Sequence, residues 1–234
     1  QIDRREYSKI MKHTLETQPN LLLKQAEIVS LEREGEEWLL TTRMEAQYRA
    51  RTVILATGTF LAGKIYVGDV SYESGPDGLF PAAYLSESLR KLGLSLRRFK
   101  TGTPARVLGR TLDYAEMEVQ PGDVPAPHFS FLSQSDPRPQ SPCYLTYTNE
   151  ATHAVIRANI HRSAMYSGLI QATGTRYCPS IEDKITRFAD KDRHQIFIEP
   201  EGLSTDEMYV QGMSTSLPQE VQADICLLYT SDAA

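Results

Sequence analysis

A short apolar run places the strongest constraint on the fold. Residues 52–56 read Thr-Val-Ile-Leu-Ala, and the run stops at Thr57 and Gly58. A continuous apolar run rich in β-branched residues predicts a strand that is buried on both faces, as in a parallel sheet covered by helices. Ligands of open α/β sheets bind where such strands end. The run therefore predicts an α/β fold with a ligand site near Thr57 and Gly58.

The segments around this run also alternate between helix and strand patterns. Apolar residues recur at helical spacing over residues 3–17, and residues 21–23 (Leu-Leu-Leu) predict a short buried strand. Residues 26–50 alternate and turn, which predicts a small antiparallel meander. A helix is expected over 84–92, closed by Gly93.

Turn-forming residues and prolines become more frequent after residue 98, where we place a domain boundary. Lys100-Thr-Gly-Thr-Pro104 is a turn-rich hinge, and residues 119–142 are dense in proline. Three elements are predicted beyond the hinge: helices over residues 155–160 and 181–188, and a strand over residues 194–198.

Composition narrows the class of protein. The chain has 41% hydrophobic and 24% charged residues, as soluble globular proteins do. No apolar run approaches the roughly 20 residues that span a bilayer, so we expect no membrane segment. Three cysteines without a Cys-x-x-Cys pair argue against a disulfide scaffold or a zinc site and favour the reducing cytoplasm. The net charge of −5 does not indicate a nucleic-acid binder, although Lys and Arg cluster over residues 97–110 and 187–194.

Several segments resemble the MnmG/GidA family. The block from Arg176-Tyr-Cys-Pro-Ser-Ile-Glu-Asp-Lys184 to His194-Gln-Ile-Phe197 is the most specific of them. The similarity runs from about residue 1 to about residue 225. The other matching segments are Val53-Ile-Leu-Ala-Thr-Gly-Thr-Phe-Leu-Ala-Gly-Lys64, Phe99-Lys-Thr-Gly-Thr-Pro104, Thr148-Asn-Glu150 with Thr152-His153, and Met165-Tyr-Ser-Gly168.

The resemblance implies a fold of two parts. It implies a two-dinucleotide-binding-type (Rossmann-like) FAD domain that an inserted α+β domain interrupts. Residues 1–98 would be part of the FAD domain, residues 99–214 the inserted domain, and residues 215–234 the start of the return, with an atypical tail from Leu227. No Gly-x-Gly-x-x-Gly is present to receive the FAD pyrophosphate. We therefore expect an internal fragment that is inactive alone and binds little FAD.

The resemblance also implies an enzyme of tRNA modification. Its members build a carboxymethylaminomethyl or aminomethyl group on carbon 5 of the wobble uridine, with FAD, NADH as reductant and methylenetetrahydrofolate as one-carbon donor. An MnmE-type GTPase partner and a homodimer are implied as well. The alternatives are a folate- and FAD-dependent tRNA uridine methyltransferase, a generic NAD(P)H-FAD oxidoreductase, and a catalytically silent module that binds tRNA or the GTPase.

Cys178 and Arg176 are the candidate catalytic residues. Ser180 and Asp183 form a capping-box pattern, so a helix should begin just after Cys178. A helix N-terminus and the Arg176 guanidinium both favour the thiolate, which is the nucleophilic form, whereas Glu182 and Asp183 oppose it. A small buried hydrophobe is the ordinary role of an isolated cysteine, and the family resemblance favours a catalytic one. In that role the thiol could be a nucleophile toward carbon 6 of uracil, or an acid or base near a methylene group carried by the flavin.

The remaining candidate residues are binding residues. The resemblance implies that FAD contacts Thr57, Gly58, Glu27 and Ala82. It implies an NAD site at Gly174, Arg176, Tyr177, Ser180 and Lys184. Lys100 and Arg106 are candidate RNA-binding residues in a basic loop, for which a solvated hinge is the plainer role. His153 and His161 are expected to be packing or surface residues, and we predict no metal site.

Overall fold

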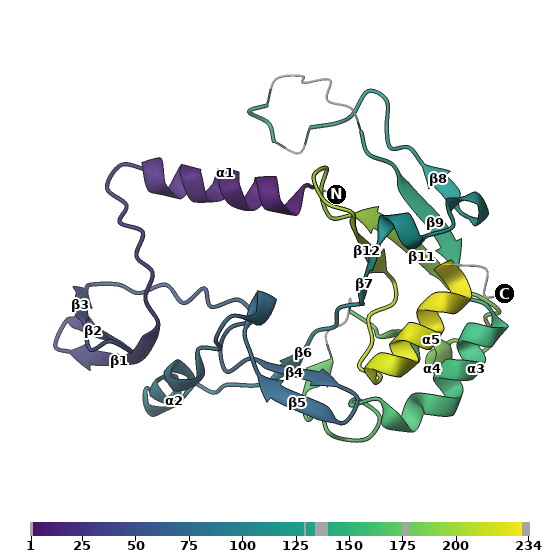
Figure 1. Cartoon of the computed structure of the whole chain (residues 1–234). Coiled ribbons are helices and arrows are strands. Elements are labelled where there is room, and N and C mark those ends of the chain that lie inside the picture. The colour runs from purple at the N-terminus through teal and green to yellow at the C-terminus, as the bar shows by residue number, and fades with distance from the viewer. Residues whose placement is uncertain (1, 129, 134–139, 175–177, 231–234) are drawn as a thin grey trace.

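The computed structural model describes residues 2–128, 130–133, 140–174 and 178–230. Figure 1 shows two regions, which α1 (Arg4–Thr17) links on one side and the segment through β4, β5 and β6 on the other. Each region has its own cluster of buried apolar side chains. One cluster comes from residues up to Leu96 and the other from Val107 onward.

The first region contains the expected meander. Its strands are β1 (Ile28–Glu34), β2 (Glu37–Thr42) and β3 (Gln47–Ala50), antiparallel in that order. Helix α2 (Ala83–Lys91) packs on β1, and Leu31, Leu85 and Leu89 are buried between them. The Ser88 hydroxyl donates to the Leu31 carbonyl at 3.0 Å and accepts from its amide at 2.9 Å. The predicted meander and helix are confirmed, and Gly93 follows the helix with a φ of +87°.

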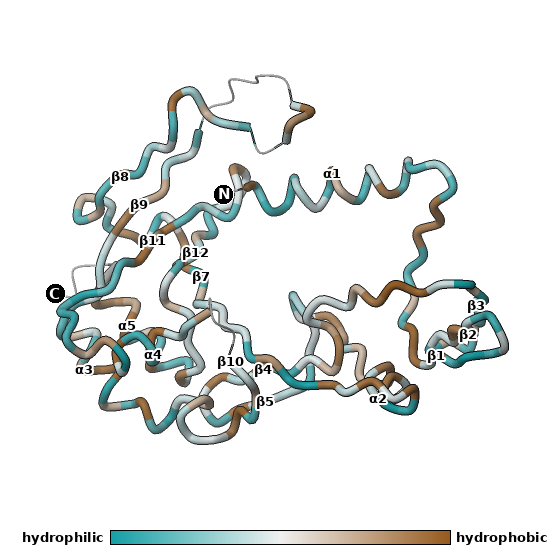
Figure 2. The backbone as a smooth tube through the Cα atoms, turned by 180° about the vertical axis from the view of Figure 1, so that it is seen from behind, coloured by the Kyte–Doolittle hydropathy of each residue, from teal (hydrophilic) through white to brown (hydrophobic). Residues whose placement is uncertain are grey.

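Two predicted strands of the first region are wrong. Residues 21–23 and 52–56 form no strand, and Leu22 and Ile54 are 83% and 91% exposed. Figure 2 shows the first of these as an apolar stretch on the connection between α1 and β1. A strand requires a neighbouring backbone for its hydrogen bonds. None of the described strands pairs with either segment, so both remain irregular.

Helix α1 and one hairpin lie between the two regions. Asp3 caps α1 by accepting the amides of Arg5 and Glu6 at 3.0 Å each, yet no residue of the helix is buried. The hairpin of β4 (Lys64–Val67) and β5 (Val70–Glu73) adds a pair of antiparallel strands that the sequence patterns did not predict. Among the described helices, none has both the length and the apolar character that a membrane crossing requires.

The second region is a sheet with helices on one face. Five antiparallel strands lie in the order β7 (Arg106–Leu108), β12 (Glu207–Gln211), β11 (Gln195–Pro200), β9 (Cys143–Tyr147) and β8 (Glu118–Gln120). The helices are α3 (Glu150–Asn159), α4 (Ile181–Arg187) and α5 (Gln219–Thr230). Buried residues of β11 and β12 pack against Ile156, Ile181 and Ile225 of these helices. The predicted helices and strand of this region are confirmed.

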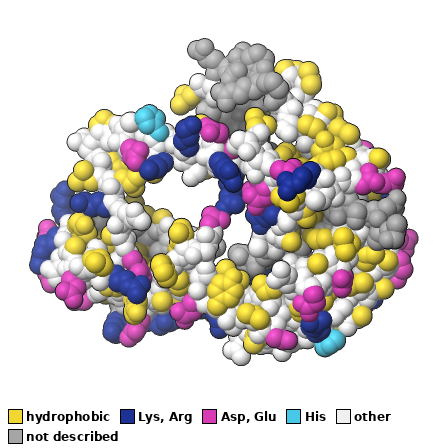
Figure 3. Space-filling view, in the orientation of Figure 1, with side chains coloured by type: hydrophobic (Ala, Val, Ile, Leu, Met, Phe, Trp, Pro, Cys, Tyr) yellow, Lys and Arg dark blue, Asp and Glu magenta, His cyan; other side chains and the backbone are white. Residues whose placement is uncertain are grey.

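Short elements connect the two regions. A parallel pair forms between β6 (Phe99–Lys100) and β10 (Thr173–Gly174). The amide of Gly68 donates to the Ser216 carbonyl at 2.8 Å. Figure 3 shows an opening through the middle of the molecule, and a cavity of about 790 Å³ lies along the polar face of α1. Single 3-10 turns occur at Pro76–Gly78, Gly109–Thr111, Tyr114–Glu116 and Ile160–Arg162.

Candidate functional site

The Cys178 thiol lies between α4 and the hinge that follows β6. The Gly102 amide donates to the Cys178 sulfur at 3.2 Å, and the thiol donates to the Gly102 carbonyl oxygen at 3.7 Å. The residue is half-buried and forms no disulfide. A backbone N–H aimed at sulfur is a fixed dipole that favours negative charge on it. Sequence reasoning did not identify Gly102 as the partner of this sulfur.

Gly102 fits into a tight space between the thiol and Ser214. A Cβ on Gly102 would lie 3.1 Å from the Ser214 Cβ and 3.7 Å from the Cys178 sulfur. The Ser214 carbonyl accepts the Ile181 amide, the first of α4, at 2.8 Å. Three segments that are distant in sequence therefore meet at the sulfur.

The predicted helix start after Cys178 is confirmed. The Ser180 hydroxyl accepts the Asp183 amide at 3.2 Å, and the Asp183 carboxylate accepts the Ser180 amide at 3.3 Å. Glu182 is fully buried, and its Oε1 accepts the Ser163 hydroxyl at 2.9 Å and the Ser216 amide at 3.1 Å. The two acids expected to oppose the thiolate are therefore hydrogen-bonded elsewhere.

A second group of side chains adjoins the hinge. The Arg106 guanidinium donates to Glu201 at 3.1 Å, to the Thr103 hydroxyl at 2.5 Å and to the Pro104 carbonyl at 3.2 Å. It lies 4.7 Å from the centre of the Tyr209 ring. Burial raises the pKa of Tyr209, Arg106 lowers it, and the charge of Cys178 raises it further. Arg106 therefore joins the hinge to Glu201 and Tyr209, and no local sequence pattern indicated this arrangement.

The described residues of the expected NAD site have polar atoms that are already engaged. Ser180 is committed to the capping box. The Lys184 ammonium donates to the Gly212 carbonyl at 3.1 Å, and burial lowers its pKa. Gly174 is exposed and pairs with Lys100, whose side chain is mostly buried at 9% exposure. Arg176 and Tyr177 lie outside the described residues.

The four residues expected to contact FAD lie near the start of α2. The Thr57 carbonyl accepts the Phe60 amide at 3.1 Å, and the Phe60 carbonyl accepts the Ala82 amide at 2.9 Å. Gly58 has a φ of +55°, and nothing lies within 4 Å of the place of a Cβ. This left-handed conformation suits glycine and leaves the backbone open to a ligand.

Arg43 connects Glu27 to the start of α2. The Arg43 guanidinium donates to the Glu27 carboxylate at 3.2 Å and lies 5.7 Å from the centre of the Tyr84 ring, in α2. The other oxygen, Oε1, is buried without a hydrogen-bond partner among the described residues. Arg98 links this area toward the thiol, because it donates to the Ala62 carbonyl at 3.0 Å and directly precedes β6.

The histidines pack rather than converge on a ligand. His153 is buried and lies 2.8 Å from the Thr148 hydroxyl through Nε2, and its ring faces His194 at 5.5 Å. His161 is exposed. In the part of the chain that the structure describes, no group of three His, Cys, Asp or Glu side chains is placed to hold a metal ion.

Comparisons with known proteins give a consistent result. A family model described as "Glucose inhibited division protein A" matches residues 1–227. The tRNA uridine 5-carboxymethylaminomethyl modification enzymes MnmG of Caldicellulosiruptor saccharolyticus and Alkaliphilus metalliredigens are 55% and 56% identical over 223 residues. Each alignment covers 95% of this chain but only 36% and 35% of the relative, so the chain spans little more than a third of their length.

Solved structures agree with these sequence matches. The structure of Aquifex aeolicus GidA in its form I crystal superposes with a TM-score of 0.90 at 45% identity, over 99% of this chain and 40% of that chain. The form II crystal of the same protein gives a TM-score of 0.88 at 42% identity, over 99% of this chain and 37% of that one.

Proposed function

Because the chain belongs to the glucose inhibited division protein A family, we propose that the protein carrying it modifies a uridine of tRNA, as the MnmG relatives are named for doing. The finer proposal is addition of a carboxymethylaminomethyl or aminomethyl group to carbon 5 of the wobble uridine. The observation that carries it is the Cys178 thiol, half-buried against the Gly102 amide at 3.2 Å. The names of the relatives favour this activity over the methyltransferase and the generic oxidoreductase.

Cys178 is proposed as the nucleophile. Carbon 5 of uracil is a weak nucleophile until a group adds at carbon 6. A bond from the thiolate sulfur to carbon 6 would move an electron pair toward carbon 5. Carbon 5 would then attack the methylene carbon of the one-carbon donor in its iminium form, and the electron pair of the C=N bond would move onto the donor nitrogen. Loss of the carbon 5 proton and breakage of the sulfur–carbon bond would restore both the ring and the thiolate. The Gly102 N–H is aimed to stabilise the sulfur when it carries negative charge.

FAD is the proposed resident cofactor and, when bound, would supply two-electron redox chemistry. Thr57, Gly58, Glu27 and Ala82 are the proposed contacts. Two observations fit: the open left-handed backbone at Gly58 and the buried Glu27 Oε1, an acceptor available to a ligand hydroxyl or amino group. The chain has no Gly-x-Gly-x-x-Gly, so these contacts are part of a larger site.

The proposed division into domains has uneven support. We assign residues 1–98 to a partial Rossmann-like FAD domain and residues 99–214 to an inserted α+β domain. The two separate apolar clusters support a boundary near residue 98. Residues 215–234, proposed as the return to the FAD domain, have less support because Leu217, Val221 and Ile225 are buried in the second cluster.

The remaining parts of the proposal rest mainly on the family. They are NADH as reductant at residues 174–184, methylenetetrahydrofolate as one-carbon donor, tRNA phosphates at Lys100 and Arg106, an MnmE-type GTPase partner, and a homodimer. Three thiols without a disulfide fit a reducing compartment such as the cytoplasm. The chain by itself is proposed to lack activity.

The test is a Cys178→Ser substitution in the protein at the length of its MnmG relatives. We expect the variant to retain FAD, measured by absorbance, and to leave the wobble uridine unmodified, measured by nucleoside mass spectrometry of tRNA. Cys143→Ser is the matched control, because it makes the same chemical change at another half-buried cysteine. Normal modification by the Cys178→Ser protein would remove the catalytic assignment.

A further inference from the structure

The hinge that carries Gly102 has no regular structure of its own. Residues 101–105 lie in neither helix nor strand, so no ladder of backbone hydrogen bonds sets their shape. Side-chain contacts must therefore hold the Gly102 amide in its direction. The Arg106 guanidinium provides two such contacts, to Thr103 and to Pro104, the two residues that follow Gly102.

Arg106 is itself anchored on the sheet. Its backbone pairs with Tyr209 across β7 and β12, and its guanidinium lies over the Tyr209 ring. The Glu201 carboxylate, whose side chain is only 11% exposed, accepts its Nε–H at 3.1 Å. A planar guanidinium can satisfy several acceptors at once in fixed geometry, which an ammonium cannot do. Arg106 thus ties the irregular hinge to the most ordered part of the second region.

Resting on the proposed role of the thiol, we infer that Arg106 is a positioning residue that keeps the Gly102 amide against the Cys178 sulfur. The path is short: the guanidinium fixes Thr103, Thr103 follows Gly102, and Gly102 donates to the sulfur.

The consequence concerns reactivity. The thiolate is the form that attacks an electrophile, and a hydrogen bond to the charged form increases its population. Loosening the hinge should therefore slow the reaction of Cys178 near neutral pH. It should have little effect at high pH, where every thiol is ionised. This pattern differs from that of a general loss of structure, which would alter reactivity at every pH.

The experiment is alkylation of the chain by iodoacetamide, with the rate at Cys178 read from its peptide by mass spectrometry. Arg106→Lys keeps the positive charge and removes the planar guanidinium that donates to several acceptors at once. We expect alkylation at about pH 7 to slow by about threefold or more, the effect of losing one modest hydrogen bond. At about pH 10.5, two units above the ordinary thiol value, the rate should match that of the unaltered chain.

Two further variants keep the outcome decisive. Thr103→Val removes only the hydroxyl at the hinge and leaves the contacts of Arg106 with Glu201 and Tyr209, so it tests the link even if Arg106→Lys fails to fold by circular dichroism. It should slow alkylation in the same way. Arg110→Lys, in an exposed pair with Asp206, should leave the rate unchanged.

The inference is overturned if folded Thr103→Val reacts at the unaltered rate at about pH 7, or if Arg110→Lys slows the reaction equally. The assay contains no tRNA, flavin or folate. Its failure is therefore separable from failure of the proposed function, which the nucleoside measurement tests independently.

Discussion

Similar apolar segments are exposed in the first region of the molecule and buried in the second. Ile54, in a run that predicts a buried strand, is 91% exposed in the first region, whereas Ile198 of β11 is fully buried in the second. Ile198 has β9 and β12 on either side of its strand, and Ile54 has no paired strand among the described residues. An apolar run therefore indicates that a segment can form a buried strand. Whether the strand forms depends on a neighbouring backbone that accepts and donates its hydrogen bonds.

The largest difference between the two regions should come from shortening the side chains at these two positions. Ile198→Ala leaves a cavity in the second cluster and should lower the free energy of unfolding by about 2–5 kcal/mol. Ile54→Ala deletes atoms that are already in water and should change it by about 0.5 kcal/mol or less. Urea unfolding followed by circular dichroism measures both. A cost at Ile54 close to that at Ile198 would mean that residues 52–56 are buried after all.

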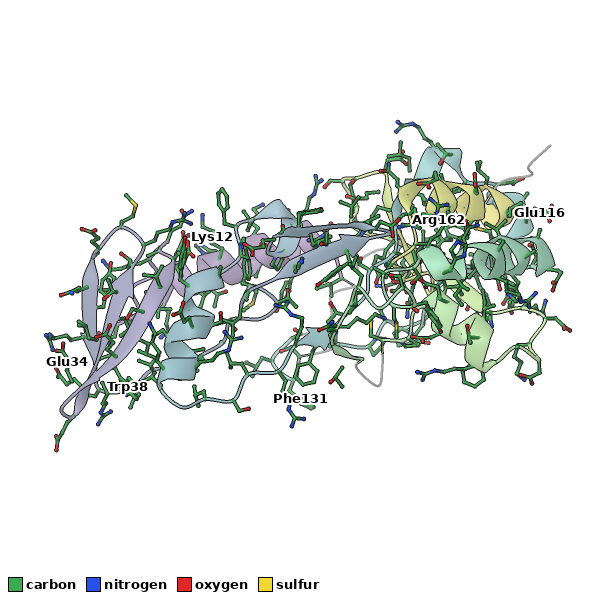
Figure 4. The ribbon with its side chains drawn as sticks, turned by 90° about the horizontal axis from the view of Figure 1, so that it is seen from below. Lys12, Glu34, Trp38, Glu116, Phe131 and Arg162 are labelled. Atoms are coloured by element: carbon green, nitrogen blue, oxygen red, sulfur yellow. The ribbon has the colours of Figure 1, made fainter. Side chains whose placement is uncertain are left out.

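A second prediction separates the stabilities of the two regions. The single tryptophan, Trp38, lies in β2 at the opposite end of the molecule from Glu116 and Arg162 (Figure 4). Among the described residues, the cluster beside it contains three buried residues, against twelve in the cluster of the second region. Tryptophan fluorescence should therefore change at a lower urea concentration than the helical circular dichroism signal. Helices α3, α4 and α5, which pack on the second cluster, contribute much of that signal. Coincident transitions would show that the two regions unfold as one unit.

Local patterns predicted the second region well. The spacing of Ile181, Ile185 and Phe188 gave helix α4, and Ser180 with Asp183 gave its cap, because these contacts join residues within one or two turns. The meander of the first region was predictable for the same reason. Residues 21–23 and 52–56 were not, since their state depends on pairing that no local pattern records.

The site was predictable only in part. Cys178 could be identified from its helix start and from the family resemblance. Its partner Gly102 lies 76 residues away. Tyr209 is placed by the register of β12 and Ser214 lies beyond the end of that strand, and the sequence specifies neither position. The Lys100–Pro104 hinge was visible as a turn, but nothing in it indicated that its glycine amide would point at sulfur.

A third prediction uses pH to act on the second region alone. Burial, followed by Arg157, lowers the pKa of His153, although Glu150 and Asp192 oppose this. Burial, His153, Lys184 and Lys191 lower the pKa of His194. As pH falls below the ordinary histidine pKa of 6.5, these histidines bind protons in the unfolded chain but not yet in the folded chain. Stability is therefore present above 6.5 and is lost as pH falls, by at most about 1.4 kcal/mol per pH unit for each histidine.

Thermal unfolding between about pH 7 and pH 5 tests this dependence around the ordinary histidine value. Replacing His153 by Gln should flatten the profile, because one of the two rings with a lowered pKa is removed. Replacing the exposed His161 by Gln should leave it unchanged. A profile that stays the same in His153→Gln would assign the pH dependence to carboxylates instead.

The smallest effect on overall stability should come from Asp3, which decides whether α1 exists. The helix has 14 residues and none is buried, and isolated helices of about 12–15 residues are marginal in water. Asp3 accepts two amides of the first turn and also the Leu203 amide of the second region, at 2.9 Å. Asp3→Ala should let the amides of α1 exchange almost as in an unfolded peptide, while the urea midpoint of the second region stays unchanged.

Asp3→Asn is the matched control, because asparagine also caps helices and should keep most of the protection. Unchanged exchange in Asp3→Ala would mean that α1 is held along its length by contacts with the rest of the chain. Loss of protection would mean that α1 is held at its end alone. Its apolar side chains Tyr7, Ile10 and Leu15 are exposed, as Ile54 and Leu55 are, so apolar residues alone would not hold either segment in regular structure.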